Sequence, residues 1–157
     1  MADLIKQPSS LDCFVCGVKN PIGLHLEFFE TESGEVICDH IIPENYQGYP
    51  GVAHGGIVAS MVDEVLGRVH MGNDPNNPRF MYTARLTVHY RKPVPVEKPI
   101  RIIGRPVKVK AHSATSRAQV LDENGELLAE ADAVLVDIPK SMFDDVDLYA
   151  LGWKVYD

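Results

Sequence analysis

The residues with the clearest chemical potential lie in the segment 54–64, where His54-Gly-Gly56 precedes two adjacent carboxylates, Asp63 and Glu64. Glycines at the start of a helix leave backbone N–H groups uncovered, and the positive end of the helix dipole strengthens these donors. Such donors suit an anion or a polarised carbonyl oxygen. A carboxylate in a mostly buried helix is costly unless it is paired or used. The segment therefore predicts a helix start that binds an anion or a carbonyl group, with an acid two turns further on.

The two carboxylates differ in their neighbours along the helix. Glu64 has Arg68 four residues later, a favourable pair that satisfies it in an ordinary, exposed ion pair. Asp63 has only the small residues Ala59 and Gly67 at the equivalent positions, which leave room beside its carboxylate. We therefore expect Asp63 to carry chemistry. A structural partner for Asp63, such as an arginine on a strand, is the alternative.

Charge is distributed unevenly along the chain. The whole sequence has 157 residues and a net charge of −7, which disfavours nucleic acid as a partner. The segment 79–117 nevertheless holds ten lysines and arginines against one acid, whereas the rest has five against 21. The basic segment predicts either a site for a phosphate-bearing small molecule or a set of solvated strand faces.

The elements that position these residues are expected to form one domain over 1–157, with a core over about 13–138. Residues 57–71 carry two apolar rows at helical spacing, so wide that the helix must be covered on most sides. An irregular N-terminal segment precedes the core, and a C-terminal tail with a short helix over 143–151 follows it. Alternation and turn residues predict six strands, over 23–31, 35–42, 80–92, 100–110, 112–121 and 126–138.

The last four strands follow one another directly, which favours a meander. We therefore predict an α+β fold in which a curved antiparallel sheet wraps around one long central helix. Glycine turns at 32–34 and 122–125 predict hairpins, and Gly104 with Pro106 predicts either a bulge or an edge position. Strict alternation over 80–92 puts Thr83 on the face opposite the helix. Thr83 can then meet Asp63 only at a strand irregularity or across a subunit interface.

Cysteine and histidine spacing gives little support to a metal site. Cys13-Phe-Val-Cys16 has the spacing used by zinc and redox motifs, but Cys38 is the only other thiol and zinc prefers four ligands. We expect a structural turn there, with a metal or redox role as the alternative. The remaining histidines are expected to be surface or packing residues: His25, His40, His70, His89 and His112.

The N-terminus and the apolar runs bear on location. The first residues carry an early acid and no apolar core of a signal peptide. The apolar runs are also far shorter than the ~20 residues that a spanning helix needs. We therefore expect a cytoplasmic protein with no membrane partner.

Four motifs occur in an order that resembles a known family: Cys13-Phe-Val-Cys-Gly with Asn20-Pro-Ile-Gly-Leu; Tyr46-Gln-Gly-Tyr-Pro-Gly with His54-Gly-Gly; Asp63 nine residues after His54; and Thr83-Ala-Arg-Leu-Thr-Val-His-Tyr-Arg-Lys-Pro93. Together they resemble the hotdog-fold acyl-CoA thioesterases, in the branch that contains the phenylacetate-pathway and 4-hydroxybenzoyl-CoA thioesterases. The resemblance covers nearly all of 13–138 and implies the hotdog fold and hydrolysis of an acyl-CoA or aroyl-CoA.

The resemblance also implies roles for individual residues. Asp63 matches a carboxylate that acts as nucleophile or as general base, and the N–H of Gly55 matches the donor that polarises the thioester carbonyl. His54 matches the histidine that shapes this turn. Thr83 matches a hydroxyl that orients the water or the carboxylate, and Gln47 lies near an amide that contacts the thioester.

The remaining implications concern binding and assembly. Strand residues of the family contact the phosphates of CoA, which points to Arg85, Arg91 and Lys92. The family's sites lie at a subunit interface, so we expect a homodimer or homotetramer. No metal and no cofactor beyond the CoA of the substrate are expected. Two alternatives stay open: a non-catalytic module that binds or senses acyl-CoA, and a hotdog hydratase or dehydratase.

Overall fold

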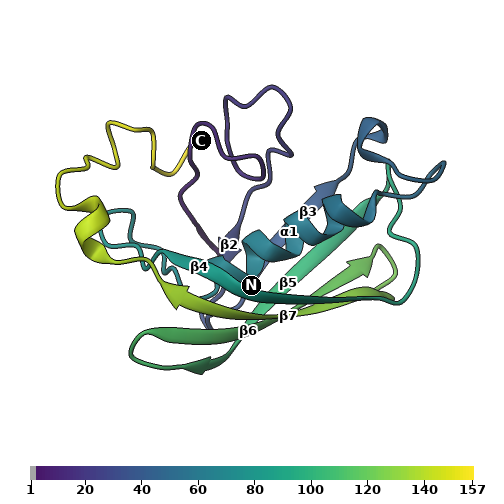
Figure 1. The fold of residues 1–157 in the computed structure, drawn as a ribbon. Helices are drawn as coiled ribbons and strands as arrows, with labels where there is room; N and C mark the ends of the chain where they lie inside the picture. Colours follow the sequence, from purple (N-terminus) through teal and green to yellow (C-terminus); the bar gives the residue numbers. More distant parts are fainter. Residues whose placement is uncertain (1–2) are drawn as a thin grey trace.

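The computed structural model describes residues 3–157, in which one antiparallel sheet curves around one long helix (Figure 1). The sheet order is β1-β2-β3-β5-β6-β7-β4. The elements are β1 (Ile5–Lys6), β2 (Phe29–Glu30), β3 (Val36–Ile41), η1 (Glu44–Tyr46), α1 (Gly55–Arg68), β4 (Met81–Tyr90), β5 (Pro99–Val109), β6 (Ser113–Asp122), β7 (Leu127–Asp137) and η2 (Lys140–Phe143). The predicted α+β architecture is confirmed.

The order of the last four strands differs from the predicted meander. β5, β6 and β7 are joined as consecutive neighbours, but β4 pairs with β7 and β5 pairs with β3. The reason lies in the connection 91–98, whose Pro93 and Pro95 do not form a tight hairpin. This connection runs beside the loop before α1, where the Ala53 N–H donates to the Val94 carbonyl at 2.8 Å. β4 is consequently an edge strand.

The helix begins two residues earlier and ends three residues earlier than the predicted range 57–71. Its sheet-facing side packs across β3, β4, β5, β6 and β7. Gly104 marks the closest approach to β5, because a Cβ there would lie 2.5 Å from a methyl group of Val65. The predicted bulge in β5 is present, with its register shift between Pro106 and Lys108.

The N-terminal segment covers the side of α1 that the sheet leaves open (Figure 1). Its buried side chains join the helix and sheet in one core: Val15, Cys16, Leu24, Leu26 and Phe28. The helix is therefore covered on most sides, as its two apolar rows predicted. Of the strand predicted over 23–31, only β2 forms, because the N–H groups of Leu24 and Leu26 donate to carbonyls of the N-terminal segment.

Two further sequence predictions have different outcomes. The hairpin turns are confirmed, since Gly34 and Gly125 adopt φ values of +84° and +81° that favour glycine. The short helix predicted over 143–151 is wrong, because η2 ends at Phe143 and the chain then returns to pair Lys154 with Ser9.

Among residues 3–157, no helix has the length and apolar character needed to cross a membrane.

Candidate active site

The start of α1 presents a free backbone donor. His54 is the N-cap residue, and its Nδ1 accepts a hydrogen bond from the Gly56 N–H at 2.9 Å. The N–H of Gly55 has no acceptor within residues 3–157. It lies at the positive end of the helix dipole without side-chain cover, so it is suited to an oxyanion.

The loop before α1 brings Gln47 to the same place. The His54 N–H donates to the Tyr46 carbonyl at 3.0 Å, and Gln47 pairs with Ala53. The exposed Gln47 side chain uses its Oε1 to accept from the Gly51 N–H at 3.0 Å. Three of the predicted site residues, Gln47, His54 and Gly55, therefore gather at the helix start.

Tyr90 is a contact of this site that the sequence did not reveal. Its hydroxyl donates to the Gly55 carbonyl at 2.5 Å, and partial burial raises the pKa of the phenol. The bond ties the helix start to the last residue of β4. The alternation over 80–92 that puts Thr83 on the far face puts Tyr90 on the helix side, and this is the signal in the sequence for the contact.

The second part of the site lies further along the helix, where Thr83 Oγ1 donates to Asp63 Oδ1 at 2.7 Å. The contact depends on a bulge in β4: Thr83 is opposite Leu135 and Arg85 is opposite Val134, so Ala84 is the extra residue. The bulge reverses the alternation and turns Thr83 toward the helix. The predicted placement of Thr83 on the far face is thus wrong, and the strand irregularity named as one alternative is confirmed.

Asp63 has no basic partner within the described part of the chain. No lysine, arginine or histidine forms an ion pair with its partly buried carboxylate among residues 3–157. The strand arginine considered as its structural partner is therefore not found. A carboxylate that is held by a hydroxyl and not neutralised remains available to attack or to activate water.

The two parts of the site do not meet within one chain. Gly55 and Asp63 are eight residues apart on α1, which at ~1.5 Å per residue is about 12 Å along the axis. A carbonyl group that reacts with Asp63 while bonded to the Gly55 N–H must lie ~3 Å from each. Within one copy of the chain, the Gly55 N–H and the Asp63 carboxylate are therefore too far apart to act on the same carbonyl group.

Glu64 occupies a different environment from its neighbour. Its carboxylate accepts from Arg68 Nε at 3.0 Å, and the Arg68 side chain is only 3 % exposed. The prediction that this ion pair is exposed is therefore wrong. The Arg68 guanidinium lies 4.2 Å from the centre of the Phe28 ring and donates to the Pro8 carbonyl at 2.7 Å. Burial raises the pKa of Glu64 to about 7, although Arg68 acts in the opposite direction.

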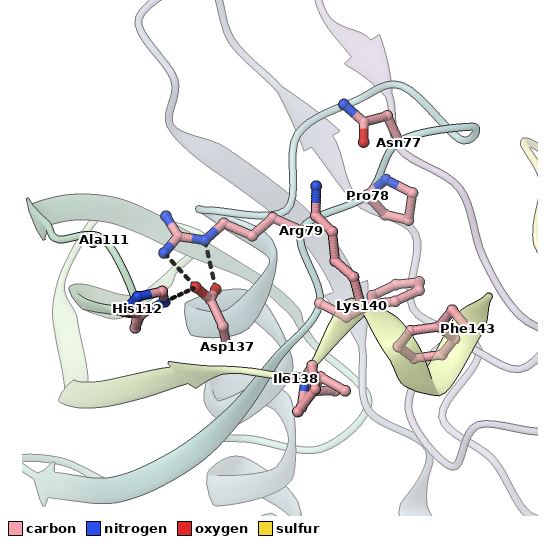
Figure 2. A pocket seen from close by; sticks show the side chains of 11 residues that line it. Asn77, Pro78, Arg79, Ala111, His112, Asp137, Ile138, Lys140 and Phe143 are labelled. Carbon is pink, nitrogen blue, oxygen red and sulfur yellow. Dashed lines mark hydrogen bonds and ion pairs between the residues drawn. The ribbon is translucent and has the colours of Figure 1, made fainter.

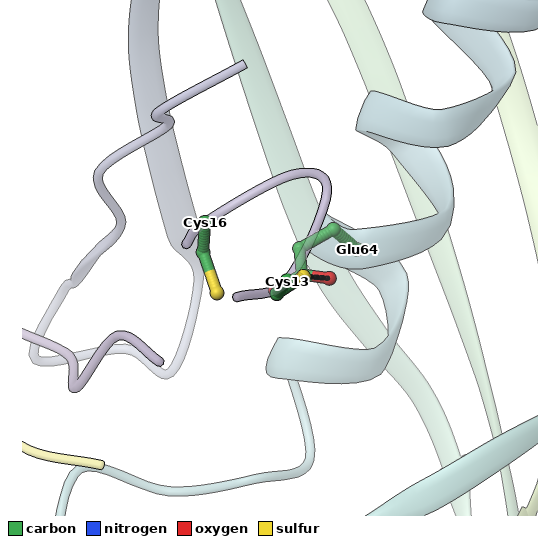
Figure 3. A group of neighbouring side chains, drawn as sticks. All are labelled: Cys13, Cys16 and Glu64. Atoms are coloured by element: carbon green, nitrogen blue, oxygen red, sulfur yellow. Dashed lines mark hydrogen bonds between the residues drawn. The ribbon is translucent and has the colours of Figure 1, made fainter. Parts of the chain in front are cut away.

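The Cys13–Cys16 motif forms the expected turn and lies against Glu64 (Figure 3). The two sulfur atoms and a Glu64 oxygen are all within 4.8 Å of one another. Cys38, in β3, is fully buried and is not part of this cluster. The third polar group beside the motif is thus a carboxylate from the helix, which spacing in the sequence did not indicate.

Most cations of the basic segment are neutralised by acids on neighbouring strands or in the turns beside them. Six of its ten cations form ion pairs: Arg79 with Asp137, Arg91 with Glu130, Lys92 with Glu126, Arg101 with Asp39, Arg105 with Glu35 and Arg117 with Asp132. Of the three residues expected to contact CoA phosphates, Arg91 and Lys92 are therefore paired. Arg85 is exposed and has no carboxylate partner within residues 3–157.

A pocket of about 560 Å³ lies where β4 begins and β7 ends (Figure 2). Its central feature is Arg79, which donates to Asp137 through Nε at 2.7 Å and Nη2 at 3.2 Å. The highly exposed His112 lies 4.0 Å from the same carboxylate. None of the predicted catalytic residues lines this pocket, and its arginine is already neutralised.

The remaining histidines occupy ordinary environments. His70 lies beside the Thr115 carbonyl at 3.0 Å, and burial lowers the pKa of both His70 and His40. His25 and His89 are exposed. None belongs to a group of potential metal ligands among residues 3–157.

Comparisons with known proteins bear on the family and the fold of this chain. A family model described as the thioesterase superfamily matches residues 50–129. The acyl-coenzyme A thioesterase THEM4 of Xenopus laevis is 25 % identical over 114 residues, which are 71 % of this chain and 49 % of that protein. This chain thus spans about half the length of that curated relative.

Solved structures show the same fold. A thioesterase superfamily protein superposes with a TM-score of 0.72 at 25 % identity, over 80 % of this chain and 60 % of that one. A Streptococcus mutans protein solved with acetyl CoA gives 0.64 at 20 % identity, over 72 % and 88 %. The E. coli PaaI protein of the phenylacetic acid degradation operon gives 0.65 at 10 % identity, over 73 % and 80 %. The hotdog fold is therefore confirmed.

Proposed function

This chain belongs to the thioesterase superfamily, and on that basis we propose that it hydrolyses the thioester of an acyl-CoA or aroyl-CoA to the free acid and CoA. The observation that carries the proposal is the carboxylate of Asp63, held at 2.7 Å by Thr83 and without a basic partner among residues 3–157. Hydrolysis of a thioester needs a nucleophile or a general base, which the Asp63 carboxylate can be. The free N–H of Gly55 supplies a donor for the oxygen of the thioester carbonyl.

In the proposed reaction, Asp63 either attacks the thioester carbon or removes a proton from the attacking water. The Gly55 N–H stabilises the negative charge that develops on the carbonyl oxygen, an effect of roughly 10²–10³ in rate per donor. The carbon–sulfur bond then breaks, and the CoA thiolate takes up the proton that Asp63 removed from water. Where Asp63 is itself the nucleophile, the thiolate takes a proton from solvent, and water then hydrolyses the acyl–Asp63 anhydride to the free acid. Thr83 keeps the carboxylate oriented throughout, while Tyr90 holds the helix start.

The separation of about 12 Å between Gly55 and Asp63 supports a site that two copies of the chain share. β4 provides the contact, because it is a ten-residue edge strand with one side unpaired in residues 3–157. Thr83 holds Asp63 near one end of β4, and Tyr90 holds Gly55 at the other. Antiparallel pairing of two β4 strands about a centre between Leu86 and Thr87 brings Tyr90 of one copy opposite Thr83 of the other. Each of the two sites then combines Gly55 from one copy with Asp63 from its partner.

Charge supports CoA as the group that leaves. Arg85 lies on the same edge strand as Thr83, and no acid neutralises it within residues 3–157. We propose Arg85 as the strongest phosphate contact of the three predicted. Arg91 and Lys92 would first have to leave Glu130 and Glu126.

A hydratase has less support. Such an enzyme needs a histidine base at this turn, but His54 Nδ1 is used to cap the helix.

A non-catalytic acyl-CoA module is distinguished by experiment. Purified protein is incubated with a panel of acyl-CoA and aroyl-CoA esters, and free CoA is measured by chromatography. CoA release by the wild type and by Asp144→Asn, but not by Asp63→Asn, supports the proposal. Binding without release supports the module, and addition of water without release supports the hydratase.

A complementation experiment tests the shared site. Proline at the first helical position keeps the helix and removes only the N–H, and His54 already has the extended conformation (ψ 136°) that a following proline requires. Gly55→Pro and Asp63→Asn homodimers should each lose about 10²-fold in kcat. Mixed dimers contain one intact site and should regain activity. A lack of recovery in mixed dimers, or a monomer in sedimentation at micromolar concentration, contradicts the shared site.

A further inference from the structure

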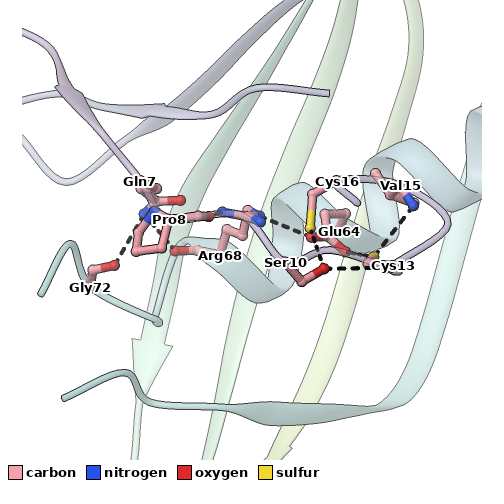
Figure 4. A network of polar contacts seen from close by, with 9 residues as sticks. All are labelled: Gln7, Pro8, Ser10, Cys13, Val15, Cys16, Glu64, Arg68 and Gly72. Atoms are coloured by element: carbon pink, nitrogen blue, oxygen red, sulfur yellow. Dashed lines mark hydrogen bonds and ion pairs between the residues drawn. The ribbon is translucent and has the colours of Figure 1, made fainter. Parts of the chain in front are cut away.

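A group of chemistry-bearing side chains that the proposed hydrolysis does not use lies where the N-terminal segment meets α1 (Figure 4). The Cys13–Cys16 turn packs there against Glu64, with Cys13 Sγ 3.9 Å from a Glu64 oxygen. The Ser10 hydroxyl is 3.5 Å from Cys16 Sγ. The three potential ligand atoms of Cys13, Cys16 and Glu64 lie within 4.8 Å of one another.

The two thiols have unequal environments. Cys13 is partly exposed, and its sulfur accepts from the Val15 N–H at 3.3 Å. A hydrogen bond from Cys16, the largest cause, lowers the pKa of Cys13 to about 6. Cys16 is only 3 % exposed, and donating to Cys13 together with burial raises its pKa to about 12. One sulfur is therefore an accessible thiolate and the other a protected thiol.

Glu64 and Arg68 complete the cluster. Burial keeps the pKa of Glu64 near 7, so its carboxylate can take up a proton at neutral pH. The buried guanidinium of Arg68 bonds Glu64 through Nε, and its Nη2 has no acceptor within residues 3–157. This positive charge also favours the thiolate form of Cys16. The cluster thus has a nucleophilic thiolate, a second thiol and a group to receive the proton of that second thiol.

The same three side chains are poorly arranged for a divalent cation. Only three donors meet among residues 3–157, whereas zinc prefers four. The Arg68 guanidinium also lies 3.0 Å from a Glu64 oxygen and repels a dication. Redox chemistry of the thiol pair needs neither a fourth ligand nor the removal of Arg68.

We propose that Cys13 and Cys16 form a reversible dithiol–disulfide pair that reacts with small-molecule disulfides, with Glu64 as the proton acceptor for Cys16. The proposal does not depend on thioester hydrolysis. The Cys13 thiolate attacks a disulfide RSSR, which breaks the sulfur–sulfur bond and releases RS⁻. Glu64 removes the Cys16 proton, and the Cys16 thiolate attacks Cys13 Sγ. The Cys13–Cys16 disulfide forms and a second RS⁻ leaves. In total, the protein dithiol and RSSR give the protein disulfide and two RSH.

Glutathione disulfide is the probe for this reaction. Full-length wild-type protein is equilibrated in buffers of increasing glutathione disulfide to glutathione ratio, quenched with acid and alkylated. Mass spectrometry should show the loss of two hydrogen atoms in the peptide with Cys13 and Cys16, reversed by excess glutathione. Cys38 should remain a free thiol and serves as the internal control.

Single variants test the assigned order of attack. Cys16→Ser should accumulate a glutathione adduct on Cys13, because no second thiol resolves it. Cys13→Ser should react at least ~10-fold more slowly, because the remaining Cys16 is buried. Glu64→Gln should slow resolution of the mixed disulfide at least ~10-fold without slowing the first attack, and Glu64→Asp should restore part of the rate.

Three results would overturn the proposal. The wild-type pair could remain reduced in glutathione disulfide and oxidise only after unfolding. Cys13→Ser and Cys16→Ser could form adducts at equal rates. Finally, the folded protein could bind one equivalent of Zn²⁺ that blocks both thiols, which would make the cluster a metal site.

Discussion

Asp63 and Glu64 are chemically similar neighbours on one helix, yet their surroundings have little in common. Asp63 points to the edge strand β4, where a hydroxyl is its partner and solvent has access. Glu64 points to the N-terminal segment, where it lies beside two thiols of that segment and the buried Arg68 of its own helix. Successive residues of a helix are rotated by ~100° about its axis, so one step along the sequence exchanges one environment for the other.

Two acids of similar chemistry thus differ in partner and in burial. The Thr83 hydroxyl orients Asp63 without cancelling its charge. Glu64 instead balances a guanidinium that is only 3 % exposed, so its charge has a structural use.

Asp63→Asn should lower kcat for acyl-CoA hydrolysis by at least ~10²-fold, because the amide keeps the shape but is neither nucleophile nor base. The free energy of unfolding should change by less than ~0.5 kcal/mol, since no ion pair is lost. Steady-state kinetics and urea denaturation measure the two quantities, with the exposed Asp144→Asn as control. Near-normal activity of Asp63→Asn would contradict the catalytic role of Asp63, and loss of folding would indicate a structural role instead.

Glu64→Gln should reverse the pattern. The substitution removes the counter-charge of buried Arg68, but the raised pKa leaves Glu64 partly protonated at neutral pH, so the free energy of unfolding should fall by about 1–2 kcal/mol. Hydrolysis by the folded protein should stay close to the wild-type rate. The double variant Glu64→Gln/Arg68→Met replaces the pair with apolar volume and should recover most of the lost stability in urea denaturation. If Glu64→Gln is as stable as the wild type, the ion pair of Glu64 and Arg68 contributes as little to stability as an exposed pair.

Thr83→Val should lower kcat by roughly tenfold, because Asp63 loses a hydrogen bond to a charged group that is worth ~1.5 kcal/mol. Thr87→Val is the matched control on the same strand: it lies beyond the bulge, on the outer face of the sheet. Kinetics of both variants with one substrate give the comparison. Equal losses in the two variants would mean that the effect comes from the strand and not from the contact with Asp63.

The lowered pKa of Cys13 predicts how its alkylation rate depends on pH. The pKa of Cys13 is lowered to about 6, so its thiolate predominates at pH 7 and is lost as the pH falls through 6. The alkylation rate with iodoacetamide should therefore fall about tenfold from pH 7 to pH 5 and change little above pH 7. The pKa of buried Cys38 is raised to about 12, so this residue should remain unreactive throughout. A Cys13 rate that still rises steeply above pH 8 would show an ordinary thiol.

Local pattern was enough for much of the fold and part of the site. Two apolar rows identified the helix, alternation identified β3 and the four long strands, and glycines identified two hairpins. The glycine pair after His54 indicated the free donor at the helix start. Small residues around Asp63 distinguished it from Glu64. Each of these features depends on residues within a few positions of one another, where helix and strand periods act directly.

Only the tertiary structure decided three other features. β4 pairs with β7 and not with β5, and one extra residue at Ala84 turns Thr83 toward Asp63. The N-terminal segment folds over α1, so Glu64 and Arg68 become buried beside the thiols instead of lying in solvent. Strand partners, bulges and burial result from packing among segments far apart in the sequence, which no local period contains. The spacing of residues 63 and 64 predicted two acids on one helix, and long-range packing gave one a threonine hydroxyl and the other a buried arginine and two thiols.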